Sequence, residues 1–269
     1  MKKNYKDITV ILTLYKTPIN KLDNLRNYKN YKIIIFDQGK NNYAKKYLKN
    51  KLNLNFKYYS FKKNIGLSKA SNFLLSKVRT KYCLFTQPDI LISNLSIQIL
   101  YKVIKKRKDV IFVSPNHKKT SRRKFDYKIL KKLNFSCIMC DVKKLNKIGF
   151  FDEDFFLYWE DIFLERKINT TKYKMAMSIN AFVKHDSSNS SENNYKTDFV
   201  RSSNFLFGEL VFDFKLKKFR FIKIFRKLMQ NIILFIFNIL IFQLKVSLKN
   251  IAYIIGILKF TIFYMSKIK

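Results

Sequence analysis

Short apolar runs rich in β-branched residues alternate with segments of helical spacing in the first part of the chain. Ile8 to Leu14 is followed by a loop, and Ile33 to Phe36 ends at Asp37-Gln38-Gly39, with leucines at helical spacing between the two runs. Two apolar strands joined by a helix form a βαβ unit, in which the strands are parallel. Ligands of such sheets gather at the carboxyl ends of the strands. The pattern therefore predicts an α/β domain whose binding site follows its strands.

The same alternation continues along the chain. We expect further strands over 56–61, 82–86 and 110–114, and helices over 19–28, 68–78 and 95–106. Residues 116–132 are strongly basic, which favours a loop. With 269 residues, 48% of them apolar, the chain is long enough for one sizeable core with an appendage.

Lysine dominates the charge of the chain, which is +37 from 55 basic and 18 acidic residues. Such a charge first suggests nucleic acid, because neutralising phosphates releases counterions. Only nine of the basic residues are Arg, however, and Arg is the residue that base reading and bidentate phosphate recognition favour. We therefore expect no specific nucleic-acid partner, and attraction to anionic membrane surfaces and polyphosphate substrates. A Lys-rich nucleic-acid-binding protein is the alternative.

The character of the chain changes near residue 200. Residues 214–269 contain no Asp or Glu, and 228–244 run for seventeen residues without a charge, the lower edge of a bilayer span. Asn231, Asn238 and Lys245 fall seven apart, which on a helix forms a narrow polar stripe. We expect 201–269 to be a basic, apolar helical extension lying in or at a membrane interface. The alternative is a helix pair packed onto the domain of residues 1–200.

Residues 149–167 concentrate acids among aromatic side chains in an otherwise basic chain. Six of the eighteen acids lie here: Asp152, Glu153, Asp154, Glu160, Asp161 and Glu165. Carboxylates held against an aromatic wall can act as a base or bind a cation. Acids in the first turn of a helix are also favoured by the helix dipole alone, which is the structural alternative. We expect the chemistry of the protein in this segment.

The spacing of this segment resembles the GFDE…FF.Y.ED.DL..R signature of family 2 inverting glycosyltransferases. The resemblance covers about residues 7–190 and implies the GT-A fold, a Rossmann-like nucleotide-sugar-binding domain with a mainly parallel central sheet. It places Asp161 at the position of the family's catalytic base, which takes the proton of an acceptor hydroxyl. Glu160 and Trp159 precede it and are candidates to contact the acceptor or its sugar ring.

Other elements of the family pattern follow in order. Asp37 occupies the place of the Asp that binds the base or ribose, and Thr13 and Tyr15 resemble the first nucleotide-contacting segment. The stretch from Asn64 to Asn72 resembles the N.G.a.a.N element, where Gly66 lets the backbone approach the nucleotide. Without the resemblance, Asp37 could merely cap a turn and Asn64-Gly66 could be an ordinary helix entry.

Gln87-Pro88-Asp89 resembles the family's metal-binding segment, usually Asp-x-Asp, with Gln87 in place of the first carboxylate. His185 falls where the family has a v.H..g.S element, whose imidazole ligates metal or touches the diphosphate. Together Asp89 and His185 imply a divalent cation, Mg or Mn, which can complete its shell with water and substrate phosphates. Gln87 leaves open whether the metal is essential, and His117, in the basic segment, is expected to be a solvated surface residue.

The resemblance implies an enzyme of hexosyltransferase type that moves a sugar from a nucleotide-diphosphate donor to a hydroxyl of a glycan or lipid-linked acceptor. The similarity is greatest to rhamnosyltransferase-like members that build bacterial surface polysaccharide. Such an enzyme would be cytoplasmic and peripheral at the inner face of the cytoplasmic membrane. An inactive glycosyltransferase-like scaffold is a further alternative, favoured by Gln87 and by scarce glycine.

Overall fold

The computed structural model describes residues 6–39, 42–118, 126–185 and 194–268. The chain divides into two compact units, the first formed by 1–151 and 164–192 and the second by 152–163 and 193–269. The expected domain boundary after residue 200 falls inside helix α7 (Tyr195–Lys215). Residues 186–188, which complete the motif that begins at His185, and residues 119–125 of the basic segment lie outside the described residues.

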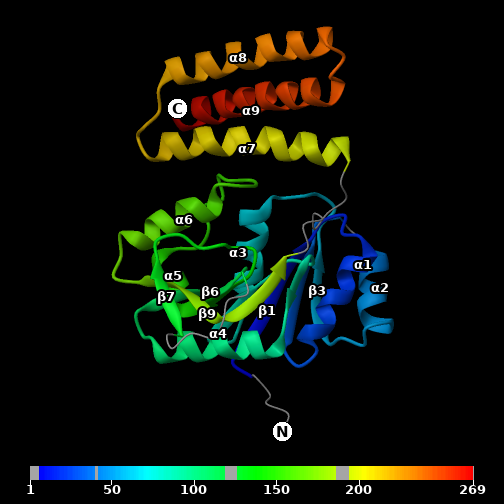
Figure 1. The fold of residues 1–269 in the computed structure, drawn as a ribbon, viewed down its shortest axis with the longest axis vertical. Coiled ribbons are helices and arrows are strands. Elements are labelled where there is room, and N and C mark those ends of the chain that lie inside the picture. The colour runs from blue at the N-terminus through cyan, green and yellow to red at the C-terminus, as the bar shows by residue number, and fades with distance from the viewer. Residues whose placement is uncertain (1–5, 40–41, 119–125, 186–193, 269) are drawn as a thin grey trace. The chain divides into compact units, whose positions relative to one another are not determined.

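The described strands of the first unit form one nine-stranded sheet with the order β3-β2-β1-β4-β8-β6-β9-β5, and β7 pairs with β9 (Figure 1). The strands are β1 Ile8–Leu14, β2 Lys32–Asp37, β3 Phe56–Ser60, β4 Tyr82–Phe85, β5 Ile90–Ile92, β6 Val110–Asn116, β7 Tyr127–Leu130, β8 Ile138–Asp141 and β9 Lys174–His185. The first four pair in parallel, whereas β8 is antiparallel to both neighbours. The expected α/β fold is confirmed, with a mixed second half of the sheet.

Helices cover both faces of this sheet. They are α1 Ile19–Leu22, the 3-10 helix η1 Asp23–Tyr28, α2 Asn42–Asn50, α3 Leu67–Lys77, α4 Asn94–Lys106, α5 Val142–Ile148 and α6 Glu160–Asn169. Side chains of α1, η1, α2 and α4 share one core cluster, and those of α3, α5 and the end of α6 share the other. The two clusters make this unit a three-layer domain, the architecture that βαβ units produce.

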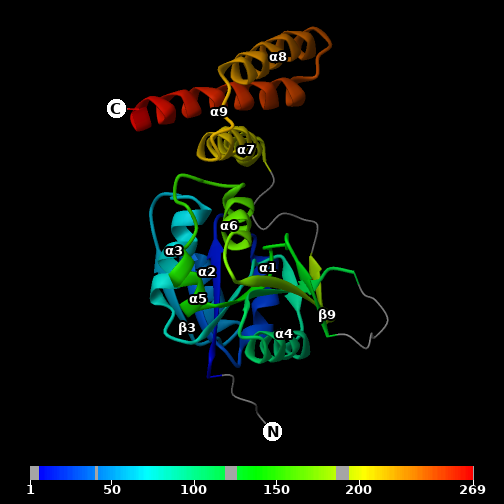
Figure 2. The same cartoon turned by 90° about the vertical axis from the view of Figure 1, so that its left-hand side faces the viewer.

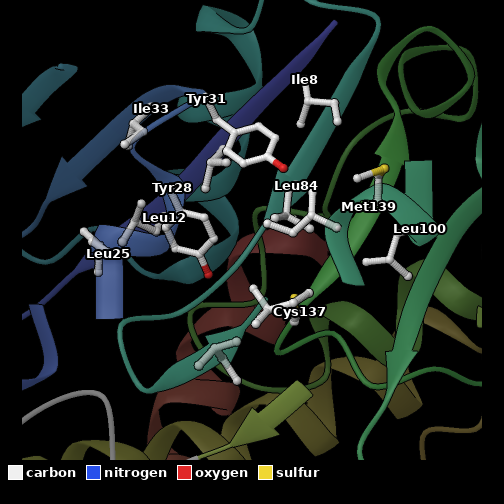
Figure 3. Close-up of a cluster of buried hydrophobic side chains, with 14 of the residues drawn as sticks. Ile8, Leu12, Leu25, Tyr28, Tyr31, Ile33, Leu84, Leu100, Cys137 and Met139 are labelled. Atoms are coloured by element: carbon white, nitrogen blue, oxygen red, sulfur yellow. The ribbon is translucent and has the colours of Figure 1, made fainter. Parts of the chain in front are cut away.

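Alternation along β1 builds these two clusters. Ile8 and Leu12 point into the first cluster, where Figure 3 shows them with Tyr28 and Leu84, and Ile11 points into the second. Tyr28 is fully enclosed, and its hydroxyl lies 3.0 Å from Oγ1 of Thr86, so the buried polar atom is satisfied. Because this hydrogen bond reaches the residue after β4, it fixes the start of the loop that carries Asp89.

Two segments differ from the sequence expectation. The helix expected over 19–28 is a short α-helix continued by a 3-10 helix, so its last turn is tighter. The loop expected over 116–132 contains β7, Tyr127–Leu130, whose outward side chains are largely exposed. An edge strand with few buried side chains has a weak alternating pattern, which explains why periodicity missed it.

The second unit contains α7, α8 (Phe221–Leu240) and α9 (Leu244–Ile268). Helix α9 lies between α7 and α8, as the two views of Figures 1 and 2 agree. The core of the second unit is aromatic and aliphatic and includes Phe155, Leu210 and Phe260. Gly256 lets α9 approach α7 closely, because a Cβ there would lie 2.5 Å from the carbonyl oxygen of Ser203. The helix pair foreseen in the sequence is thus part of a three-helix unit.

Candidate active site

The carboxyl ends of β1, β2 and β4 meet at one edge of the sheet. In the parallel register, Leu14 is opposite Asp37 and Ile11 is opposite Phe85. Thr13 and Tyr15 lie at the end of β1 and are partly exposed, as a ligand contact requires. Neighbouring strands are about 5 Å apart, so the ends of β2 and β4 are separated by roughly 10 Å. The edge is therefore wide enough for a nucleotide.

Asp37 is fixed at this edge by two hydrogen bonds. Its Oδ1 accepts from the backbone N–H of Gly39 at 2.8 Å, and its Oδ2 accepts from the Tyr58 hydroxyl of β3. Burial, together with the Asp37 carboxylate, raises the pKa of Tyr58, so the phenol stays protonated and keeps donating. The turn interpretation of Asp37 is thus correct as far as Gly39 is concerned. Tyr58 is a supporting residue that the sequence pattern gave no reason to choose.

The neighbouring Gln38 ties this strand end to the segment before α3. Its Oε1 accepts from the backbone N–H of Ile65 at 2.9 Å, and Asn64 Oδ1 accepts from Gly66 N–H at 2.9 Å. Gly66 has φ 89°, in the region that side chains disfavour, and it caps α3 without a side-chain hydrogen bond. The structure therefore brings Asn64 and Gly66 next to the strand that ends in Asp37. A nucleotide-contacting role for these residues remains a proposal.

Asn72, which ends the N.G.a.a.N-like element, holds the start of the acid-rich segment. Its Nδ2 donates to the carbonyl oxygen of Phe151 at 2.9 Å, and its Oδ1 accepts from the N–H of Phe151 at 3.1 Å. This two-way clamp satisfies both backbone groups of one residue. The element thus links α3 to the segment that begins at Gly149. The position of Asn72 at the end of this motif is the sequence signal that could have identified this contact.

Asp89 and His185 meet because β5 pairs antiparallel with β9, with Ile90 opposite His185. His185 Nε2 lies 3.2 Å from Asp89 Oδ2, while Asp89 Oδ1 is buried and has no hydrogen-bond partner in the described part of the chain. A buried carboxylate oxygen without a donor, beside an imidazole, fits a divalent cation that takes its other ligands from phosphate and water. No group of three or more metal-ligating side chains occurs among the described residues.

His117 is exposed at the surface, as expected, but it also has His185 as a neighbour. Its ring centroid lies 6.3 Å from that of His185. Burial lowers the pKa of His117, and the nearby His185 lowers it further. An imidazole held neutral in this way can accept a hydrogen bond beside the Asp89–His185 pair.

In the second unit, a strained turn precedes the proposed base. Tyr158 and Trp159 both have positive φ, 68° and 70°, which costs a non-glycine residue roughly 1–2 kcal/mol. The Trp159 indole holds the turn, because its N–H donates to the carbonyl oxygen of Phe205 at 3.0 Å and its ring packs against Phe212. The indole therefore anchors the turn to α7. The contact with a sugar ring expected of Trp159 remains a prediction.

Glu160 and Asp161 begin α6, where the helix dipole favours carboxylates. Glu160 is buried, and burial together with the Asp161 charge raises its pKa to about 8. Burial also raises the pKa of Asp161, although its Oδ1 accepts from the Ile162 N–H at 2.8 Å. At neutral pH the pair therefore holds a proton on Glu160. Asp161 is the one that is partly exposed, as a base must be.

The other acids of the segment have structural partners. Lys215 Nζ lies 2.9 Å from Asp152 Oδ2 and 2.6 Å from Asp154 Oδ2, which connects the segment to the end of α7. Glu165 accepts from the backbone N–H of Leu133 at 2.6 Å in the first unit. Asp152, Asp154 and Glu165 therefore have structural contacts, which are ion pairs and a backbone hydrogen bond and not the helix dipole. Glu160 and Asp161 remain as the candidates for chemistry.

The expected site residues are divided between the two units, some in each. In the first unit, Asn64 and Gly66 lie beside the strand of Asp37, and Asp89 contacts His185. Trp159, Glu160 and Asp161 belong to the second unit.

A parallel β3-β2-β1-β4 core with polar groups at its carboxyl edge, continued by a mixed half-sheet, defines the chain as a GT-A fold protein. The sequence profile described as glycosyl transferase family 2 matches residues 11–166. The chain belongs to this family. Among curated proteins, no sequence matches significantly.

Solved structures share the fold at low sequence identity. A structure of GalNAc-T7 with UDP, GalNAc and Mn²⁺ aligns with TM-score 0.60 and 12% identity over 77% of this chain and 48% of that chain. The mannosyltransferase PcManGT from Pyrobaculum calidifontis, with GDP-Man and Mn²⁺, aligns with TM-score 0.58 and 14% identity over 79% and 66%. S. aureus TarS 1-349 with UDP-GlcNAc aligns with TM-score 0.50 and 16% identity over 74% and 66%. The chain thus spans about half to two thirds of these proteins.

Proposed function

We propose that the protein is an inverting glycosyltransferase that moves a sugar from a nucleotide-diphosphate donor to a hydroxyl of a glycan or lipid-linked acceptor. Family membership supports the reaction class, and the similar folds named above were solved with UDP, UDP-GlcNAc or GDP-Man. One observation carries the donor site. Asp89 presents a buried carboxylate oxygen next to His185, with no hydrogen-bond partner among the described residues, in the loop that follows β4.

The edge of the first unit binds the donor in this proposal. Asp37 accepts hydrogen bonds from donor groups of the base or ribose, and Tyr58 and Gly39 hold its carboxylate in place. Gly66 allows close approach of the backbone, and the N-terminus of α3 favours negative charge. A divalent cation held by Asp89 and His185 would neutralise charge on the departing diphosphate. Both solved relatives named with Mn²⁺ support this cation.

Asp161 acts on the acceptor. Its carboxylate accepts the proton of the attacking hydroxyl while that oxygen forms a bond to the anomeric carbon. The bond from that carbon to the diphosphate oxygen breaks, and the nucleoside diphosphate leaves with the electron pair. A single displacement of this kind inverts the anomeric configuration. Protonated Glu160 beside Asp161 adds no second negative charge at neutral pH, which keeps the Asp161 carboxylate able to ionise.

The first experiment is a panel of UDP-, GDP- and dTDP-sugars, assayed for donor hydrolysis and for transfer to simple acceptors. We expect turnover with at least one donor. Absence of binding and turnover across the panel would leave the inactive scaffold as the better account. Tight, salt-resistant binding of duplex DNA without nucleotide-sugar binding would favour the nucleic-acid alternative.

The role of Asp161 is tested by Asp161→Asn, which keeps the size of the side chain and removes the base. We expect transfer to fall by at least about 10²-fold, since a positioned base contributes 10²–10⁴-fold. Glu153→Gln is the matched control, because Glu153 is an exposed acid of the same segment. Unchanged transfer by Asp161→Asn, with donor binding intact, would disprove its assignment as the base.

The family subtype and the biological setting are also part of this proposal. Resemblance of the motifs to rhamnosyltransferase-like members supports a role in bacterial surface polysaccharide synthesis, at the inner face of the cytoplasmic membrane. Acceptors linked to a lipid carrier fit a protein whose second unit is basic and apolar. Product analysis with a lipid-linked acceptor distinguishes this setting from transfer to a soluble glycan.

A further inference from the structure

Near the turn of the α8–α9 hairpin, polar side chains are buried and apolar side chains are exposed. This is the reverse of the arrangement in a soluble protein. The buried residues of α8 are Asn231 and Asn238, and on the first turns of α9 they are Ser247 and Asn250. Around them the apolar side chains are exposed: Ile233 66%, Leu234 39%, Ile236 53%, Phe237 55%, Ile239 42%, Leu240 70%, Ile241 43%, Phe242 88% and Leu244 62%. An exposed patch of this kind marks an interaction surface.

The two asparagines of the polar stripe noticed in the sequence face inward, whereas its third member, Lys245, is exposed and lies on α9 because α8 ends at Leu240. Among the described elements α8 packs chiefly on α9, so the asparagines lie on the side of α8 that meets α9. Asn231 Nδ2 donates to the Lys227 carbonyl oxygen at 2.8 Å, and Ser247 Oγ donates to that of Leu244 at 2.8 Å. Asn250 Nδ2 is buried without a hydrogen-bond partner among the described residues. Small polar side chains between helices, such as Asn231 and Ser247 here, are typical of helices packed in lipid.

The shape of the apolar surface favours lipid over a protein partner. At 100° per residue, the exposed apolar positions of α8 from Leu234 to Leu240 extend around roughly 220° of the helix. A partner helix covers a stripe of about 100°, whereas acyl chains can surround every position that α9 leaves open. The covering medium is thus fluid and apolar.

Charge identifies the kind of membrane. Lys223 and Lys227 are not free for lipid phosphates, because both are paired with Glu209 and Lys223 also with Asp213 of α7. Exposed cations nevertheless remain at both ends of the apolar surface. They are Lys217, Lys218, Arg220 and Arg226 at the start of α8, and Lys245 and Lys249 after the turn. Exposed cations on either side of an apolar surface favour contact with anionic headgroups. Among the described helices α8 does not satisfy the length and hydropathy of a span, which favours an orientation in the plane of the interface.

Helix α9 satisfies the length and hydropathy of a membrane span, over Leu244–Ile268. It nevertheless packs on α7 along one side and on α8 along another, with Gly256 against the backbone of Ser203. Packed on both neighbours, α9 keeps only part of its apolar surface exposed, with Leu258, Ile262 and Met265 among the exposed side chains. The buried side chains of α8 are polar and its apolar side chains are exposed, so we assign the main contact with acyl chains to α8.

We propose that α8 and the α8–α9 turn are embedded in the acyl region of one leaflet of an anionic bilayer, with α8 lying parallel to the membrane plane and α9 covering its polar side. Residues 152–163 belong to the same compact unit, so the membrane-bound unit also carries Asp161. If the proposed function is correct, the base is delivered by the unit that meets a membrane-held acceptor. The embedding itself does not depend on any catalytic activity.

The test uses the full chain carrying Phe242→Cys labelled with an environment-sensitive dye, since the three native cysteines are buried. Vesicles of phosphatidylcholine with about a quarter phosphatidylglycerol should shift the dye emission to the blue, and quenchers on the acyl chains should quench it. Lys57→Cys, an exposed position on β3, is the labelled control and should show neither change. We expect binding at least tenfold weaker without the anionic lipid, and retained in high salt once formed, because acyl-chain contact is not screened.

A pair of variants separates the two sides of α8. Phe237→Glu, on the exposed side, should abolish vesicle flotation, whereas Asn238→Leu, on the buried side, should leave flotation in place. Vesicle binding without acyl-chain quenching would overturn embedding in favour of surface attraction. A blue-shifted dye without lipid, together with a dimer by analytical ultracentrifugation, would instead make this surface a contact between two copies of the chain. None of these readouts uses glycosyl transfer, so they stand apart from the proposed function.

Discussion

The indole ring of Trp159 packs against Gly208 of α7 with no space for a side chain between them. A Cβ on Gly208 would lie 2.9 Å from Trp159 Cδ1 and 3.2 Å from the carbonyl oxygen of Tyr158. Both atoms belong to the strained turn that precedes Glu160 and Asp161. Gly208 therefore makes it possible for α7 to hold this turn.

We expect Gly208→Ala to displace Trp159 and loosen the turn. Overpacking of this kind costs about 1–3 kcal/mol of unfolding free energy. Trp159 is the only tryptophan, so intrinsic fluorescence reports on this site alone, and its emission should shift to the red. Lys196→Ala, an exposed substitution on α7, is the matched control and should leave the emission unchanged. A Gly208→Ala protein with unaltered emission and stability would show that the turn does not need this contact.

Glu160 should make the stability of the second unit depend on pH. Its pKa is raised from 4.5 to about 8 in the folded protein, so the folded state holds a proton that the unfolded state has lost across this interval. The contribution of Glu160 to stability is therefore fully present below pH 4.5 and is lost as the pH rises toward 8, by an amount on the order of a few kcal/mol. Glu160→Gln stays neutral and should flatten this dependence. Urea unfolding followed by Trp159 emission measures the effect.

The control for this measurement is Glu153→Gln, because Glu153 is exposed and lies in the same segment. It should keep the pH dependence of the unaltered protein. The interpretation of Glu160 as a proton-holding group would fail if both variants gave the same profile.

Tyr58 should influence donor binding through Asp37. Tyr58→Phe removes the hydroxyl that donates to Asp37 Oδ2 and leaves the ring in place. One hydrogen bond to a charged group contributes about 1.5–3 kcal/mol, and a water molecule that replaces the hydroxyl restores part of this energy. We therefore expect the KM for the donor to rise roughly five- to tenfold, with kcat little changed. Tyr59→Phe removes a hydroxyl from the adjacent position of β3 and should keep the KM. An equal effect of both substitutions would argue against a specific role of Tyr58.

Asp89 should govern the response to divalent cations. Asp89→Asn removes the negative charge of the carboxylate whose Oδ1 is buried and unpartnered, and should raise the Mn²⁺ concentration for half-maximal transfer by at least about tenfold. His185→Gln should have a smaller effect in the same direction, and Glu153→Gln, an exposed acid of the second unit, should have none. Full transfer in the presence of a chelator would remove Asp89 and His185 from a metal role.

Local pattern was sufficient for the strands β1 to β4 and β6 and for the helices α3 and α4 of the first unit, but it did not identify α2, β5, α5 or β9. Apolar runs such as Ile8–Leu14 and Ile33–Phe36 are strands because β-branched residues pack well on a sheet, and the polar residues that follow them lie at its carboxyl edge. The contact between Asp89 and His185 agrees with their common assignment to a metal. The 3-10 turn at Asp23–Tyr28 and strand β7 escaped prediction, because their periodicity is short and weak.

The sequence by itself determined the strands of the parallel half of the sheet, their order along the chain and the concentration of acids near Asp161, since these depend on neighbouring residues along the chain. Only the tertiary structure decided which acids pair with Lys215 and that the side of α8 with Asn231 and Asn238 is the buried one. It also decided that residues 152–163 belong with the C-terminal helices. The reason is physical. A pairing or a buried face depends on which distant segment supplies the partner, and periodicity shows that a face exists without showing what covers it.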